Sequence, residues 1–421
     1  MNLMRRGFLV AGGLGVLSLS QLAQAQERNS TQHKAVINIF LGGGPPHQDM
    51  WDIKDKAPTE IRGEFKPIST NVAGIQIGEC FPMIASMFDK FTAIRSVIGC
   101  KNRHDGYQCT TGWLREDKVS GSTYPAIGSV TAKVLGSVSV AVPPNVTLLE
   151  ETSHSPWYDF EKPGYLGTAY QSFTPNGQMM KNLKLNISKN RFKKRQDLLR
   201  GVDISNIDMK LLTEESFDVL MSSKLLDALD LSKENPKILE RYGTGKPYKY
   251  QYDGASTNNQ KLLIARRLVQ AGARSITLNY GRWDSHGANF DLVRHHGSRL
   301  DQGVSALVED LDQHGILDDV TVVVWGEFGR TPKINKDAGR DHWSQVSCAL
   351  LAGGGMQHGQ IIGSTNRYGE EAADRPVHIQ EVCATMYKAI GIDPTTETII
   401  DNTGRPQYLL EHRTPIQELV G

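Results

Sequence analysis

The segment that most constrains the fold runs from Val320 to Trp343. Its first part, Val320 to Trp325, is a short run of apolar, mostly β-branched residues that breaks at Gly326. Such a run is typical of a strand that is buried on both faces. The polar part that follows carries acidic, basic and histidine side chains. Because ligands of open α/β sheets bind beyond the carboxyl ends of the strands, we expect this strand to present a functional site.

Short apolar runs alternate with segments of helical periodicity along most of the chain. The alternation predicts an α/β fold, with a doubly wound, mostly parallel sheet and helices on both faces. Residues 147–252 break the pattern and are predicted to form a largely helical and loop insertion, with a helix or helix pair at 211–231. The predicted strands are 35–41, 91–97, 275–280, 320–325 and 347–352, and the predicted helices are 81–88, 127–135, 259–271, 291–314 and 379–390.

Polar loops follow four of the predicted strands directly. Because the carboxyl ends of parallel strands lie at one edge of a sheet, residues that are distant in sequence are expected to converge there. The loops are 42–49, 99–107, 281–290 and 326–343, and their candidate residues are Asp49, His104, Asp105, Asp284, His286, Glu327, Arg330, Asp341 and His342.

Carboxylates and imidazoles gathered in one place favour a divalent metal ion. Their oxygen and nitrogen atoms suit zinc, manganese, iron, magnesium or calcium, and the five cysteines show no C-x-x-C spacing for a thiolate site. Clustered carboxylates also need a compensating positive charge. Either the metal or Arg330 supplies it, or Arg330 holds an anionic substrate oxygen. A structural ion-pair network is the competing interpretation.

Motifs of several other enzyme classes are missing. The chain has no G-x-S-x-G elbow and no G-x-x-x-x-G-K-[ST] phosphate loop. The segment 42–49, GGGPPHQD, lacks the glycine spacing of a dinucleotide fingerprint, and its two prolines remove amide donors. Lys and Arg number 47 against 46 Asp and Glu, so no charge bias indicates nucleic acid as a partner.

Residues 1–25 are predicted to be a twin-arginine export signal. Arg5 and Arg6 precede a weakly apolar run, and Ala23-Gln24-Ala25 forms a cleavage site. The run is shorter than the roughly 20 residues of a membrane span, so cleavage is favoured over a membrane anchor. We therefore expect the twin-arginine export machinery as a partner, a linker at 26–34, a single domain at 35–421, and a periplasmic or secreted protein without a stable membrane span.

The same segments resemble a known family. The motifs RRGFL, GGGPPHQDMWD, IRGEFKPI, PGYLG, ARRLVQAGAR, WDSHGANF, GEFGRTP, GRDHW, LLAGGG and DRPV are similar to those of the DUF1501 family of exported bacterial proteins. The resemblance covers nearly the whole mature chain. That family is placed by similarity in the alkaline phosphatase and sulfatase superfamily, which implies an alkaline phosphatase-like core with a metal-centred site.

The resemblance also implies roles for individual residues. Asp49 resembles the first metal-ligating aspartate of the superfamily, and Asp284 with His286 resembles the second acid and histidine pair at a shorter spacing. His342, with Asp341 beside it, resembles the last ligand.

Two departures from the superfamily pattern stand out. Glu327 occupies the place of an Asp-His pair, with Phe328 where the histidine stands, so a single-metal or altered two-metal site is expected. The region 102–113 has no convincing nucleophile, since it offers only Cys109, Thr110 and Thr111 beyond His104 and Asp105. Either water acidified by a metal attacks directly, or another side chain takes the role, or the chemistry has been lost.

The leading hypothesis is an exported, metal-dependent hydrolase of phosphate or sulfate esters, or of a related anionic ester, either small or polymeric. The alternative is a non-catalytic envelope protein that keeps the fold for binding or as a scaffold. Arg330 is expected to hold substrate oxygens and His104 to transfer protons. The candidate metal-site residues are Asp49, Asp284, His286, Glu327, Asp341 and His342, and the candidate catalytic residues are His104, Asp105 and Arg330.

Overall fold

The computed structural model of the protein describes residues 33–139, 141–175, 194, 197, 223–243, 246–250 and 253–421. Residues His33–Gly421 cluster into one compact unit. The predicted export signal and nearly all of the predicted linker lie outside the described residues. The same holds for residues 211–222 of the helix predicted at 211–231. The predicted domain boundaries therefore stay predictions.

An eight-stranded sheet forms the centre of this unit. Its order is β13-β4-β12-β9-β1-β8-β7, and β16 pairs with β4 beside this path. All pairs are parallel except those of β12, which is antiparallel to both β4 and β9. The strands are β1 Ala35–Phe40, β4 Phe91–Ile98, β7 Asn145–Thr147, β8 Ser275–Asn279, β9 Val320–Trp325, β12 Ser347–Gly353, β13 Gln360–Ile362 and β16 Val377–His378.

The predicted α/β class with a mostly parallel sheet is confirmed. The antiparallel strand β12 follows β9 without an intervening long helix, and neighbouring antiparallel strands need no crossover connection. Between them the chain forms only the short hairpin of β10 (Gly329–Arg330) and β11 (His342–Trp343). That hairpin keeps residues 326–343 at the edge of the sheet.

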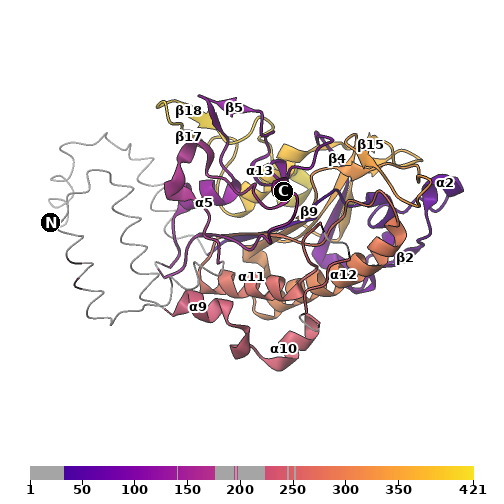
Figure 1. Cartoon of the computed structure of the whole chain (residues 1–421), viewed down its shortest axis with the longest axis horizontal. Coiled ribbons are helices and arrows are strands. Elements are labelled where there is room, and N and C mark those ends of the chain that lie inside the picture. Colours follow the sequence, from indigo (N-terminus) through magenta and orange to yellow (C-terminus); the bar gives the residue numbers. More distant parts are fainter. Residues whose placement is uncertain are drawn as a thin grey trace. The chain divides into compact units, whose positions relative to one another are not determined.

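Helices cover both faces of the sheet (Figure 1). Alternate side chains of β1 belong to different cores: Ile37 and Ile39 pack in one hydrophobic cluster, whereas Val36 and Phe40 pack in the other. The first cluster is covered by α3 (Pro82–Ser86), α11 (Asn259–Ala271) and α12 (Asn289–Gln313), and the second by α4 (Gln108–Thr111), α5 (Ile127–Leu135) and α13 (Ile379–Ala389).

The observed helices follow the predicted ones closely, except for the helix predicted at 81–88. That segment is divided into the short α3 and the 3-10 helix η2 (Phe88–Lys90). The remaining helices and 3-10 helices are η1 His47–Asp49, α2 Thr59–Arg62, η3 Ser155–Trp157, η4 Gly164–Leu166, η5 Thr168–Tyr170, α9 Lys224–Leu229, η6 Leu231–Lys233, α10 Pro236–Arg241, η7 Leu317–Asp319 and α14 Gln417–Val420. The remaining strands are β2 Pro67–Ser69, β3 Gln76–Gly78, β5 Lys118–Val119, β6 Ser122–Thr123, β14 Ser364–Thr365, β15 Ala372–Asp374, β17 Thr398–Ile400 and β18 Pro406–Tyr408.

The strand register brings the four polar loops to one edge of the sheet. Phe40, at the end of β1, pairs with Trp325 at the end of β9 and with Asn279 at the end of β8. On the other side of β9, Ala349 of β12 lies opposite Trp325, and Ser347 pairs with Val97 near the end of β4. The loops that follow β1, β4, β8 and β9 therefore begin at the same edge of the sheet.

The described part of the predicted insertion contains short helical elements between loops, from η3 to α10. No helix among the described residues is both long and apolar enough to cross a lipid bilayer. All five cysteines are free, and four of them are buried.

Candidate metal centre

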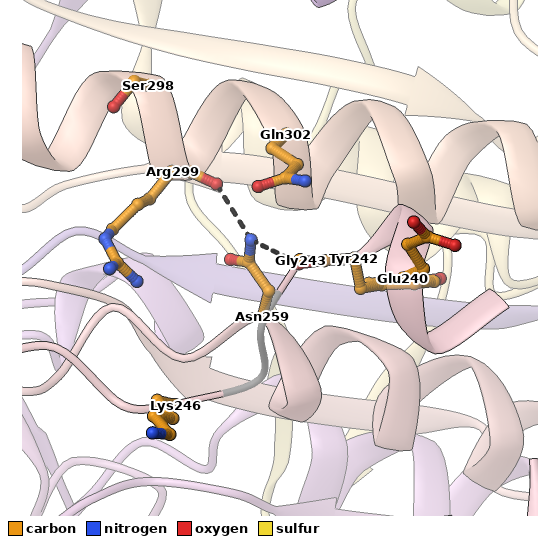
Figure 2. A pocket seen from close by; sticks show the side chains of 8 residues that line it. All are labelled: Glu240, Tyr242, Gly243, Lys246, Asn259, Ser298, Arg299 and Gln302. Atoms are coloured by element: carbon orange, nitrogen blue, oxygen red, sulfur yellow. Dashed lines mark hydrogen bonds between the residues drawn. The ribbon is translucent and has the colours of Figure 1, made fainter. Parts of the chain in front are cut away.

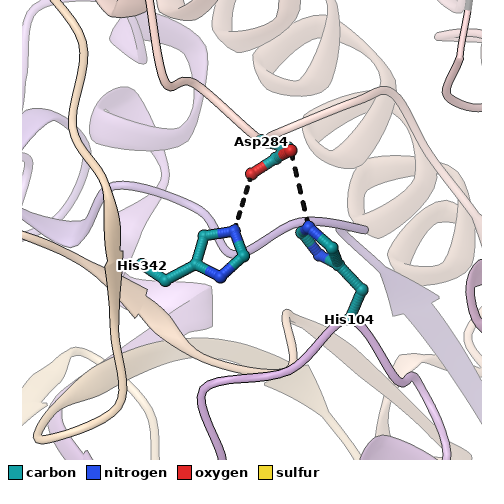
Figure 3. A group of neighbouring side chains, drawn as sticks. All are labelled: His104, Asp284 and His342. Carbon is teal, nitrogen blue, oxygen red and sulfur yellow. Dashed lines mark hydrogen bonds and ion pairs between the residues drawn. The ribbon is translucent and has the colours of Figure 1, made fainter.

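Asp284 is the centre of the candidate site. It follows β8 in the loop 281–290, and it is buried. His342 places its Nε2 atom 3.0 Å from Oδ1 of Asp284, and His104 places its Nε2 atom 3.5 Å from Oδ2 (Figure 3). His286 also points its Nε2 atom at Oδ1, at 3.1 Å. Three imidazoles from three loops thus converge on one carboxylate.

The geometry of His104, Asp284 and His342 fits a divalent metal ion. One ligand atom of each residue lies within 4.8 Å of the other two. The imidazoles of His342 and His104 approach different oxygens of the Asp284 carboxylate, at 3.0 and 3.5 Å. Two nitrogens and one oxygen are also donors that zinc, manganese and iron accept.

Glu327 lies behind His104, on the side away from Asp284. Its Oε1 atom is 3.6 Å from Nδ1 of His104. Glu327 is buried, and it accepts hydrogen bonds from the backbone N–H of Gly43 at 2.9 and 3.1 Å and from the indole N–H of Trp157 at 2.9 Å. Metal-binding histidines commonly direct their second nitrogen at such a carboxylate. The Glu327 carboxylate therefore faces Nδ1 of His104, at ion-pair distance, and not Asp284.

The electrostatics of the cluster favour a protonated His104 at neutral pH. Burial lowers the pKa of His104, but hydrogen bonding and charge from Asp284 and Glu327 outweigh it and raise the value to about 9. Burial dominates at His342 and lowers its pKa below the ordinary value. Burial also raises the pKa of Asp284, yet its bonds to His104 and His342 and the charge of Arg330 hold it well below the usual range. A metal ion at this place would replace the proton on His104.

His286 and Asp341 form an exposed pair at the rim of the cluster. Nδ1 of His286 lies 2.7 Å from Oδ1 of Asp341, and both side chains are about half exposed. Asp341 also accepts hydrogen bonds from Asn335. Its carboxylate thus holds His286 in place, while the other nitrogen of His286 faces Asp284.

Arg330 is fully buried beneath the site. Its guanidinium donates to Asp284 and to the backbone oxygens of Gly43, Gly44 and Arg340. The expected role of Arg330 in holding substrate oxygens needs donors that face a ligand, whereas these donors face the protein. The structure places Arg330 as the positive charge that compensates Asp284 and as a link between two loops.

Asp49 does not join the cluster. Both of its carboxylate oxygens accept hydrogen bonds from the buried guanidinium of Arg340, at 2.7 and 3.0 Å, and Oδ2 also accepts one from Asn289 at 2.8 Å. Arg340 was not among the expected site residues. Arg340 directly precedes Asp341 and His342 in the sequence. Nothing in that position predicted that Arg340 would pair with Asp49 from the loop after β1.

Asp105 is also directed away from the cluster. Arg115 forms two hydrogen bonds with its carboxylate, each 2.8 Å long, and the backbone N–H of Tyr107 donates a third at 3.1 Å. Arg115 holds Asp105 in a bidentate pair, which leaves His104 as the residue of this loop that reaches Asp284.

The candidate nucleophiles in α4 bond to the protein itself. The hydroxyl groups of Thr110 and Thr111 donate to the backbone oxygen of Tyr107. Cys109 is fully buried, and burial raises the pKa of its thiol well above the ordinary value. No side chain of α4 therefore offers an activated nucleophile to Asp284 or the histidines.

Arg282 is a second basic residue that the sequence did not bring to attention. It donates to the backbone oxygen of Asp284, and one of its nitrogens lies 3.4 Å from Oδ2 of the same residue. Asp253, which directly follows the predicted insertion, pairs with Arg282 at 2.5 Å. His154 in turn lies 3.5 Å from Asp253. The insertion thus contributes a histidine, and the residue that follows it contributes an acid, to the ion pairs around Arg282.

One protein family and several solved structures are similar to this chain. The family model described as "Protein of unknown function (DUF1501)" matches residues 33–420. No curated protein matches the chain. Among solved structures, Ps i-CgsB in complex with k-i-k-neocarrahexaose is similar at 12% identity and a TM-score of 0.39, over 86% of this chain and 72% of that one.

Two further solved structures are similar at the same level. The PsFucS1 sulfatase from Pseudoalteromonas sp. has 12% identity and a TM-score of 0.38, over 91% of this chain and 74% of that one. The phosphonate monoester hydrolase SpPMH from Silicibacter pomeroyi has 10% identity and a TM-score of 0.33, over 86% and 73%. At these identities no activity follows for this chain.

Proposed function

Because this chain belongs to the DUF1501 family, whose function is unknown, we propose a function from its own site: metal-dependent hydrolysis of a phosphate or sulfate ester, or of a related anionic ester. The observation that carries the proposal is the convergence of His104 and His342 on Asp284, with their ligand atoms within 4.8 Å of one another. These residues would hold one divalent ion. The donor set favours zinc, manganese or iron over magnesium and calcium, which prefer oxygen ligands.

A bound divalent ion would polarise an ester oxygen and acidify a water molecule. The protein's own residues would do the rest. Glu327 holds His104 through its position behind Nδ1, and Arg330 compensates the charge of Asp284 from below. His286, supported by Asp341 and partly exposed, is placed to accept or donate a proton at the rim of the site. No protein nucleophile is required.

Two considerations support an anionic ester as the substrate. A divalent ion held by His104, Asp284 and His342 would present positive charge to a ligand, which favours an anion over a neutral ester. The sequence motifs also resemble a family placed by similarity among alkaline phosphatases and sulfatases.

A non-catalytic binding or scaffold role is the second candidate, and Arg330 favours it. This guanidinium already neutralises Asp284 from within the protein, so the polar cluster can be stable as an ion-pair network without a metal. The two candidates differ in one property that can be measured. A hydrolase turns over an ester when metal is bound, whereas a binding protein or scaffold does not.

The first experiment measures metal content and turnover together. Purified protein is loaded with zinc or manganese, its metal content is determined by mass spectrometry, and hydrolysis of 4-nitrophenyl phosphate and 4-nitrophenyl sulfate is followed. We expect one bound ion per chain and turnover of at least one ester. Asp284→Asn should lose both, whereas Asp291→Asn, at an exposed residue paired with Arg294, should keep both.

Two results would count against the proposal. Wild-type protein that retains no metal after loading, and whose thermal stability does not change in chelator, would reject the metal centre. Protein that binds metal but turns over no ester in a wide panel would favour the binding or scaffold role.

Export through the twin-arginine route is part of the same proposal. Arg5 and Arg6 precede the apolar run and the Ala23-Gln24-Ala25 site. Replacing both arginines by lysine keeps the charge but removes the pair that this route recognises. Cell fractionation should then find the variant in the cytoplasm and the wild-type protein outside it; equal distribution of the two would exclude this route.

A further inference from the structure

A pocket of about 520 Å³ lies on the helical face of the protein, between the end of α10 and the helices α11 and α12 (Figure 2). This volume lies within the range of small-molecule sites. Most of its lining side chains are polar or charged, so it suits a ligand with several hydrogen-bonding groups. The lining residues that matter for the argument are Glu240, Lys246, Asn259, Ser298, Arg299 and Gln302.

Two cations of this pocket have no acidic partner among the described residues. Arg299 stacks its guanidinium over the ring of Tyr248, with 4.6 Å between the guanidinium carbon and the ring centroid. Stacking occupies the face of the guanidinium and leaves the N–H groups at its edge free for an oxyanion. Lys246 is exposed nearby. By contrast, Arg294 on the same helix pairs with both Glu64 and Asp291.

The floor of the pocket is held firmly. The amide of Asn259 donates to the backbone oxygens of Tyr242 at 2.9 Å and Arg299 at 3.2 Å. Its oxygen accepts a hydrogen bond from Tyr280 at 2.5 Å. These bonds tie α12 to the turn after α10, so the backbone of Arg299 is positioned before any ligand arrives.

Charge is distributed unequally across the pocket. Figure 2 shows Arg299 and Lys246 on one side and Glu240 on the opposite side, with Asn259 between them. A ligand with negative charge at both ends would meet Glu240 unfavourably. A ligand with one anionic end and a hydroxyl-rich end satisfies both sides, since carboxylates and amide oxygens accept hydrogen bonds from hydroxyl groups.

We propose that this pocket binds a sugar that carries one phosphate or sulfate group. The tetrahedral oxyanion binds the edge of Arg299 and the ammonium group of Lys246, as a bidentate guanidinium contact does elsewhere. The sugar hydroxyls bind Gln302 and Glu240. None of these residues shares a hydrogen bond or ion pair with His104, Asp284 or His342 in the described part of the chain, so binding here does not depend on the metal centre.

The test is titration calorimetry of purified protein with glucose 6-phosphate, glucose 6-sulfate, glucose and inorganic phosphate, all in chelator so that no metal site contributes. We expect at least one of the two charged sugars to bind more tightly than both glucose and inorganic phosphate. Arg299→Ala should weaken that binding about tenfold or more, the loss expected for a charge-assisted contact. Arg294→Ala, the matched control on the same helix, should leave it unchanged.

Folding and specificity are controlled within the same experiment. Arg299→Lys keeps the charge but not the bidentate edge, so its affinity should fall between those of the wild type and Arg299→Ala, with an unchanged melting temperature. The preferred sugar distinguishes a phosphate ligand from a sulfate one. Absence of binding to either charged sugar, equal binding of glucose or inorganic phosphate, or an Arg299→Ala affinity equal to that of the wild type would each overturn the proposal.

Discussion

Glu327 illustrates how one buried side chain sets the geometry of the candidate centre. It is buried under the loop after β1, and the Gly43 N–H and the Trp157 indole hold its carboxylate in place. From there it faces Nδ1 of His104. The sequence analysis placed Glu327 among the candidate ligands; in the structure its carboxylate faces Nδ1 of His104, 3.6 Å away.

Replacing Glu327 by Gln should weaken metal binding without removing it. Loss of an orienting carboxylate behind a metal-binding histidine typically lowers affinity about 10- to 100-fold. Competition with a fluorescent chelator measures the metal affinity of Glu327→Gln, and Glu371→Gln, at an exposed position, serves as control. If Glu327→Gln lost metal binding as completely as Asp284→Asn, Glu327 would itself be a metal ligand.

Glu161 should make stability fall as the pH rises. It is buried, its Oε1 accepts a hydrogen bond from Thr277, and burial raises its pKa to about 7. Below the ordinary value of 4.5 the carboxyl is protonated in both folded and unfolded chains; between 4.5 and about 7 only the unfolded chain ionises. The contribution of Glu161 to the free energy of unfolding is therefore complete below pH 4.5 and is lost by about pH 7. The total loss is roughly 3 kcal/mol.

Urea unfolding at pH 5 and pH 8 tests this expectation. Glu161→Gln cannot ionise, so its stability relative to the wild type should rise between the two pH values, by up to roughly 3 kcal/mol. The exposed Glu151→Gln variant should show no such rise. A Glu161→Gln difference that is independent of pH would mean that Glu161 ionises normally in the folded protein.

At the scale of elements, the loop after β1 is the part of the fold that the site depends on most. Gly43 has a φ of 98°, and its N–H and C=O bond to Glu327 and Arg330. A Cβ atom at this position would lie 2.6 Å from both Cβ and the backbone nitrogen of Asp284. The loop after β1 therefore contacts the loop after β8 directly at Gly43, which has no side chain.

Gly43→Ala should disrupt the metal centre, because it pushes Asp284 out of place. We expect metal affinity to fall at least as far as in Glu327→Gln and the melting temperature to drop. Gly74→Ala is the matched control: Gly74 has a φ of 82°, but a Cβ atom there would meet no other atom within 4 Å. It should lose about 1 kcal/mol from its left-handed backbone yet keep its metal affinity, so equal metal loss in both variants would contradict the steric explanation.

Across the whole molecule, a bound metal would connect loops that follow three different strands. His104 follows β4, Asp284 follows β8, and His342 belongs to the β10–β11 hairpin after β9. An unfolded chain cannot hold these residues together, so a metal would bind the folded state preferentially. Ligand binding of that kind stabilises the fold as a whole.

Calorimetric melting with and without zinc or manganese measures this coupling. At a free metal concentration about 100 times the dissociation constant, the gain is about 2.7 kcal/mol, and the melting temperature should rise accordingly. Asp284→Asn should show no rise. A rise of equal size in that variant would place the bound metal elsewhere on the protein.

The sequence predicted the scaffold well and the partners of its charged residues poorly. The strands β1, β4, β8, β9 and β12 lie where short apolar runs predicted them, and the loops after four strands meet at one edge. His104, Asp284, His286 and His342 do converge. Asp49 and Asp105, predicted from the same loops, instead pair with Arg340 and Arg115.

The sequence alone determined the strand pattern, because burial on both faces of a sheet requires apolar runs and these are local. Only the tertiary structure decided which acids remain available to a ligand. Asp49 and Arg340 are far apart in the chain, yet they form a buried pair, and a buried carboxylate requires a cation whose position depends on packing. The buried guanidinium of Arg330 likewise bonds to the protein and not to a substrate, because it balances the charge of Asp284 where the loops meet.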